Sequence, residues 1–339
     1  MIPALVGGVL LAAITLYATF GGADFGAGFW NLVAGGDIKG ERPRQLIEDS
    51  ITPVWESNHV WLIFALVLFW TAYPEAFAAV ASADAVPLWL AAFGIVLRGA
   101  AFAFGKEVHR LSARRALGVI FALSSLLTPF FMGCVVGGIA AGAVPADATR
   151  SSSASWTGAT SILCGFVFVG ACAYLAAVYL VHEAQRRDDT QLQRYFIHRA
   201  QLAGVATGVV SLVTLAALRS ANGQMFDRLT GRALPLVLLT GVCGLIVLAQ
   251  LTLRRLRGVR EVAWVGVAAI VWGWGVAQYP TVLPGSSLTL SNAGAPGATL
   301  DTLVVLAVVV LVVVAPSFLL LFWLHGRRLL TSEDPKDST

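Results

Sequence analysis

Four ionisable side chains stand in long apolar segments of this 339-residue chain: Asp24, Glu56, His59 and Arg98. Charged groups inside a bilayer cost about 3 kcal/mol even on the mildest scale, so each is a functional candidate. Glu56 and His59 are three residues apart and therefore share one face of a helix. Two carboxylates near an arginine and a histidine can relay protons, with burial and neighbouring charge setting their proton affinities. The alternative is a structural ion pair in which Arg98 neutralises Asp24 or Glu56 and joins helices.

The elements that position these groups follow from composition. Hydrophobic residues make up 57% of the chain and charged residues 12%, and the mean hydropathy is +0.77. These values exclude disordered and disulfide-rich classes and indicate an all-α polytopic membrane protein, since a spanning helix needs about 20 apolar residues. Nine apolar runs predict nine transmembrane helices, at 3–24, 54–73, 82–104, 116–141, 158–182, 201–220, 234–252, 261–280 and 301–325.

The basic residues predict the orientation of these helices. With the N-terminus outside and the C-terminus inside, 18 of the 23 Lys and Arg residues fall in inner segments and four in outer ones. This asymmetry is the one that cytoplasmic loops show. The outer exceptions are Arg150, Arg219, Arg228 and Arg232. The loop 221–233 holds the last two, and Arg219 stands just before it. In this orientation Asp24, Glu56, His59 and Arg98 all lie in the cytoplasmic third of the membrane.

Residues 1–330 are predicted to form a single transmembrane domain, and residues 331–339 a polar cytoplasmic tail. The nine helices allow two four-helix bundles with the ninth helix appended. We expect no metal site, because the four cysteines form no CxxC pair or cluster. We also expect no haem ligand in this chain, because no second intramembrane histidine faces His59. Nothing in the sequence suggests a nucleic-acid partner.

Aromatic and amide side chains flank the polar positions. Trp55, Asn58 and Trp61 surround Glu56 and His59 in sequence and are expected to shape the proton route. At the outer end of the eighth helix, Gln278, Tyr279 and Pro280 form a second motif, in which Pro280 ends the helix.

Four segments, taken together and in this order, resemble subunit II of the cytochrome bd-type quinol oxidases. They are Gly21 to Phe29, Ile51 to Ile63 with its Trp-Glu-x-Asn-x-Val-Trp-Leu block, Leu97 to Phe102, and Ala277 to Pro280 followed by Leu288 to Ala293. The resemblance implies nine helices with the N-terminus outside, in the bacterial plasma membrane.

The resemblance also implies a function. The family's enzyme oxidises a membrane quinol and reduces dioxygen to water, and its haems b and d are bound by subunit I. Subunit II stabilises subunit I and supplies a cytoplasmic proton route, in which the acid of the Trp-Glu block corresponds to Glu56. Asp24 and Arg98 fall on polar positions of the family, and His59 stands where relatives often have glutamine. A structural quinone, bound lipids and small accessory transmembrane subunits occur in some members.

A secondary transporter with a carboxylate ion site on the cytoplasmic side is the alternative function. Nine spans and a charged cluster would suit it. Against it, the sequence has neither a clear inverted repeat nor a pair of broken helices, which many transporters have.

Overall fold

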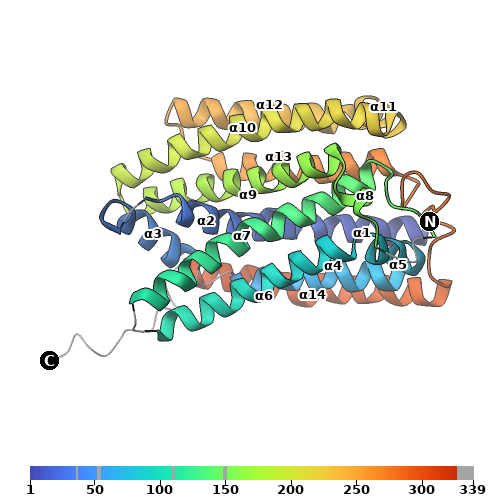
Figure 1. The fold of residues 1–339 in the computed structure, drawn as a ribbon, viewed down its shortest axis with the longest axis horizontal. Helices are drawn as coiled ribbons and strands as arrows, with labels where there is room; N and C mark the ends of the chain where they lie inside the picture. The colour runs from blue at the N-terminus through green and yellow to red at the C-terminus, as the bar shows by residue number, and fades with distance from the viewer. Residues whose placement is uncertain (36, 52–54, 109–110, 148–150, 327–339) are drawn as a thin grey trace.

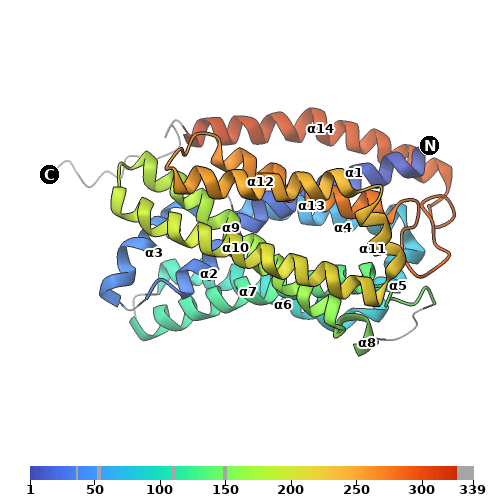
Figure 2. The ribbon, with the colours of Figure 1, turned by 90° about the horizontal axis from the view of Figure 1, so that it is seen from above.

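The computed structural model describes residues 1–35, 37–51, 55–108, 111–147 and 151–326. Within these ranges it describes the backbone, but not the side chains, of residues 37–39, 51, 55–57, 106, 107, 111, 112, 114, 314, 315, 318, 319 and 321–326. The described chain is helical, and an isolated bridge between Thr281 and Thr289 is the β-type pairing in it. Long helices run side by side along the molecule (Figures 1 and 2). In chain order they are α1 Ile2–Leu16, the π-helical turn η1 Tyr17–Gly21, α2 Gly22–Leu32, α3 Asp37–Ile51, α4 Trp55–Ala72, α5 Pro74–Ala83, α6 Ala85–Glu107, α7 Leu111–Ala140, α8 Ser153–Trp156, α9 Ala159–Arg186, α10 Thr190–Ala221, α11 Gly223–Thr230, α12 Leu234–Thr252, α13 Val259–Gln278 and α14 Gly297–Gly326.

Among the described residues, seven helices are long and apolar enough to cross a membrane, and a bent pair makes up to eight. The part of α14 that meets the apolar criterion, Gly297–Val313, is shorter than a full span. The predicted all-α polytopic fold is therefore confirmed. The count of nine spans, their orientation and the two-bundle arrangement remain predictions.

The segment 74–81, treated above as a connection, is helical. Helix α5 continues from α4 after a bend of 115°. Tyr73 leaves the helical region (φ −135°, ψ 64°), because the residue before a proline is disfavoured there, and Pro74 starts the new helix. α4 and α5 are thus one broken pair, a feature that the sequence did not reveal. α5 lies at the end of the molecule that holds the N-terminus, which we call the N-terminal end (Figure 1).

Helix α9 occupies the centre of the fold and packs against α2, α7, α10 and α13. Its inward positions are small, including Ala173, Ala176 and Ala177, all buried. Small residues let helix backbones approach closely, which is how helices associate in lipid. α9 therefore holds the α2 segment and its acidic residue in place.

At the opposite end, residues 37–51 form a helix, α3, where the sequence analysis predicted none. Leu46 and Ile47 of α3 are buried in the same core as α9. Asp189 joins Arg42 at 2.6 Å across this end of the molecule. Backbone N–H groups, chiefly that of Leu192, and the Arg42 charge lower the pKa of Asp189.

Candidate functional site

Asp24 and Arg98 meet as a buried ion pair between α2 and α6. The Arg98 nitrogens Nη1 and Nη2 donate to the two carboxylate oxygens of Asp24 at 3.0 and 2.5 Å, and Nη2 also donates to the Asp24 backbone carbonyl at 3.0 Å. The two residues are 6% and 2% exposed. This forked geometry is the strong form of a guanidinium–carboxylate contact. The predicted proximity of these two positions is thus found in the structure.

Aromatic rings enclose the guanidinium. Its central carbon lies 4.6 Å from the centre of the Phe25 ring and 4.9 Å from that of Phe121 on α7, distances at which ring faces attract cations. Arg98 Nε and the Tyr17 hydroxyl are both buried without a hydrogen-bond partner among the described residues. The pair therefore joins α2, α6 and α7 and leaves donors unused beside it.

The helical backbone just before Asp24 is irregular. The π-helical turn Tyr17–Gly21 precedes it, and such turns are frequent at functional sites. One turn further on, a Cβ at Gly26 would lie 1.8 Å from the carbonyl oxygen of Cys172 on α9. Glycine at this position is what allows α2 to lie against α9. Trp30 strengthens the contact by donating Nε1–H to the Ala173 carbonyl at 2.7 Å.

Helix α4 contributes the remaining candidates. Asn58 is buried, and its Nδ2 lies 3.4 Å from the carbonyl of Phe20, in the π-helical turn. His59 and Trp61 are half-buried and engaged with neighbouring groups. The side chains of Trp55 and Glu56 lie outside the described residues, so their positions relative to Asp24 stay predictions. Through Asn58, α4 contacts the chain at Phe20, one helical turn before Asp24.

The motif at the N-terminal end is a backbone junction. Gln278 donates its amide to the carbonyl of Val282, while its Oε1 is buried without a partner among the described residues. Arg232 donates to the carbonyls of Ala277 and Tyr279. Pro280 follows the end of α13. These contacts fix the turn after α13 and bring no ionisable pair together.

Another buried acid, Asp84, lies in the turn between α5 and α6 and was not among the predicted site residues. It is fully buried, and the Ser155 hydroxyl lies 2.5 Å from its Oδ1, while Oδ2 has no partner among the described residues. The sequence does contain a signal for Asp84, because it is a charged residue inside the predicted span 82–104. It was overlooked because it stands at the very start of that span.

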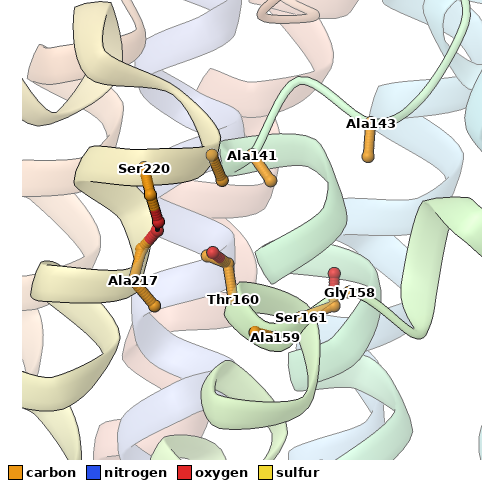
Figure 3. A pocket seen from close by; sticks show the side chains of 9 residues that line it. Ala141, Ala143, Gly158, Ala159, Thr160, Ser161, Ala217 and Ser220 are labelled. Carbon is orange, nitrogen blue, oxygen red and sulfur yellow. Dashed lines mark hydrogen bonds between the residues drawn. The ribbon is translucent and has the colours of Figure 1, made fainter.

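A cavity of about 310 Å³ opens between the ends of α7, α9 and α10 (Figure 3). Its polar groups are hydroxyls of Thr160, Ser161 and Ser220, beside alanines and a glycine. Haem iron takes histidine, methionine, cysteine or tyrosine ligands, so these residues do not fit a haem. Among the described residues no cluster of three or more metal-binding side chains occurs.

Comparisons with known proteins agree with one another. The family model "Cytochrome bd terminal oxidase subunit II" matches residues 2–325. Cytochrome bd ubiquinol oxidase subunit 2 of Bacillus subtilis is 23% identical over 91% of this chain and 90% of its own length. Cytochrome bd-I ubiquinol oxidase subunit 2 of Escherichia coli K12 is 26% identical over 98% and 95%.

A solved structure has the same fold. A chain of the bd oxidase from Geobacillus thermodenitrificans superposes with a TM-score of 0.80 at 22% identity, covering 98% of this chain and 99% of the other. Together with the match of the family model, these findings show that the chain belongs to the cytochrome bd terminal oxidase subunit II family, as a multi-pass protein of the bacterial cell membrane and part of an oxidoreductase complex.

Proposed function

We propose that this chain pairs with a haem-bearing subunit I, stabilises it, and supplies a proton route from the cytoplasm for the reduction of dioxygen to water by a membrane quinol. Family membership and the buried polar group between α2, α4 and α6 support this proposal. Reduction of dioxygen consumes protons inside the membrane, so the complex needs a chain of protonatable groups that is closed to bulk water. The observation that carries the proposal is the buried Asp24–Arg98 pair beside α4.

In this proposal each side chain has its own part. Glu56 is the main relay, and Asp24 is its partner near the entry. Arg98 is the counter-charge whose position shifts the proton affinities of both carboxylates. His59 is an auxiliary group, and Asn58, with Trp55 and Trp61, holds α4 against the π-helical turn.

The redox groups belong to the partner in this proposal. Haems b and d carry the electron transfer and dioxygen chemistry when bound, and subunit I ligates them. In this proposal the chain binds no haem itself; the polar side chains of the cavity between α7, α9 and α10 are hydroxyls, which are not haem ligands. A structural quinone and small accessory transmembrane subunits are further components that the family resemblance suggests.

Replacing the relay tests the proposal. In the purified complex, Glu56→Gln should lower quinol-driven oxygen uptake about 100-fold, the lower end of the range for loss of one proton-transfer group, while haem content and co-purification of the partner stay normal. Glu75→Gln is the matched control, because Glu75 is exposed in the first turn of α5 at the opposite end of the molecule.

Three results would overturn parts of this proposal. Wild-type turnover with Glu56→Gln would make Glu56 structural. Loss of haem together with the partner would show an assembly role instead. A colourless preparation without a second large subunit would remove the oxidase assignment of the complex and favour the transporter.

A further inference from the structure

The arginines at the N-terminal end remain unexplained by the proposed function. Arg219, Arg228 and Arg232 flank or occupy the short connection between α10 and α12, on the side predicted to be poor in basic residues. Two of them are engaged within the chain: Arg219 lies over the ring of Phe226 at 5.5 Å, and Arg232 donates to backbone carbonyls. The side chain of Arg228 makes no hydrogen bond or ion pair with the part of the chain that the structure describes. Its charge is therefore available to an external group.

Arg228 lines a pocket of about 210 Å³ between α11 and the loop after α13. Gln224 lines the same pocket from α11, and Thr281 and Ser286 line it from the loop. No carboxylate is among its lining residues. The adjacent Asp227 is exposed, outside the lining, and forms no ion pair with described residues. The pocket thus offers a positive charge and polar groups without a compensating acid.

The level of this pocket in the membrane can be inferred from helix α11. Figure 2 shows α11 turned across the long axis of the molecule, between the ends of α10 and α12. Met225 is buried and Phe226 and Leu229 are half-buried, whereas Gln224 and Asp227 are exposed. A short amphipathic helix joining two spans lies at the boundary between acyl chains and headgroups. We therefore expect the pocket to open at the level of the lipid phosphates.

A neighbouring cation makes an anion still more favourable. Partial burial, followed by the charge of Arg228, lowers the pKa of Arg232, which lies outside the spans. Two guanidinium groups thus share this end of the molecule. An anion bound beside Arg228 would relieve their repulsion as well as satisfy the unused donors.

We propose that the pocket between α11 and the loop 279–286 binds the phosphate of an anionic phospholipid headgroup, with Arg228 as its main ligand. Arginine suits this task because its planar fork donates two parallel hydrogen bonds to phosphate oxygens. A zwitterionic lipid carries the same phosphate but also a cation, which the Arg228 and Arg232 charges disfavour. The site is separate from the ion pair of Asp24 and does not depend on the oxidase reaction.

The test uses the complex as isolated from its membrane, exchanged into detergent to remove loosely held lipid. Binding of phosphatidylglycerol, phosphatidylcholine and inorganic phosphate is measured separately by native mass spectrometry and by the shift in melting temperature. We expect Arg228→Gln to weaken phosphatidylglycerol binding about tenfold, the loss of one charge-assisted contact. Arg228→Lys should weaken binding less than Arg228→Gln, because lysine keeps the positive charge but loses the two parallel hydrogen bonds.

Arg219→Gln is the matched control, because it removes an equal charge on the same side without touching the pocket. Unchanged binding in the Arg228→Gln variant, or equal weakening in both glutamine variants, would overturn the proposal. Equal retention of phosphatidylcholine would remove the preference for anionic lipid. Displacement of the lipid by millimolar inorganic phosphate would reassign the site to soluble phosphate.

Discussion

Two buried aspartates near opposite ends of the molecule have opposite surroundings. Asp24, on α2, faces a guanidinium that contacts both its carboxylate oxygens. Asp84, between α5 and α6, faces only the hydroxyl of Ser155, and one of its oxygens has no partner among the described residues. Both side chains are almost inaccessible to water. The difference therefore lies in charge compensation and not in burial.

This difference separates two uses of a buried acid. A charge pair contributes stability only while both members are present, because either one alone is an uncompensated buried charge. An acid that faces a hydroxyl carries no such partner, and burial favours its neutral form. In the structure Asp84 lies in the turn between the apolar helices α5 and α6 and belongs to neither of them. Burial raises its pKa from 3.8 to about 6, while the Ser155 hydrogen bond lowers it in part. Asp84 is therefore a carboxyl whose pKa of about 6 is closer to neutral pH than that of an exposed aspartate.

The largest effect is expected from breaking the ion pair. Asp24→Asn leaves Arg98 buried and unpaired, which should cost about 4 kcal/mol of stability and reduce the amount of assembled complex. Thermal unfolding of the purified complex measures the loss. The double variant Asp24→Leu/Arg98→Met should recover most of it, because no buried charge remains. If the double variant is as unstable as the single one, packing and not charge is the main contribution of the pair.

A second variant tests the packing of α2 against α9, which holds Asp24 in place. Gly26→Ala forces a methyl group against the Cys172 carbonyl on α9 and should cost about 3 kcal/mol through overpacking. Gly8→Ala on α1 is the control, because nothing lies within 4 Å of its added Cβ. Equal melting temperatures for the two variants would show that α2 and α9 can separate freely.

Removing the Ser155 hydroxyl tests the contribution of its hydrogen bond to Asp84. Ser155→Ala leaves the Asp84 carboxyl without its hydrogen bond and should cost about 2 kcal/mol near neutral pH. Ser153→Ala, at an exposed position of α8, should have little effect. A loss of similar size in both variants would point to the helix α8 itself and not to the carboxyl contact.

The smallest effect is a pH dependence. Folded Asp84 keeps its proton up to about pH 6, whereas the unfolded chain releases it near 3.8, so its contribution to stability falls as pH rises through this window. Between about pH 5 and about pH 8 the loss is about 1 kcal/mol. Asp84→Asn should remove this part of the dependence, seen as a smaller difference in melting temperature between the two pH values. An unchanged difference would mean that Asp84 is ionised throughout.

The sequence by itself determined the class of protein, the approximate places of most helices and the residues worth attention. These follow from local quantities: runs of apolar residues, the cost of a charge among them, and the family-like segments around Asp24, Glu56 and Arg98. The hydropathy pattern could not predict the bend at Tyr73 or the helix α3, because α5 and α3 depend on a proline junction and on burial of Leu46 and Ile47 against distant helices.

Only the tertiary structure decided which charges meet. Residues 24 and 98 are 74 positions apart, and nothing local in the sequence selects Asp24 as a partner of Arg98. The choice depends on the close approach of α2 to α9 at Gly26 and on the rings of Phe25 and Phe121 around the guanidinium. The partners of Asp84 and the pocket of Arg228 likewise depend on loops brought together at one end of the bundle. Contacts between distant segments are set by packing, which a one-dimensional pattern does not contain.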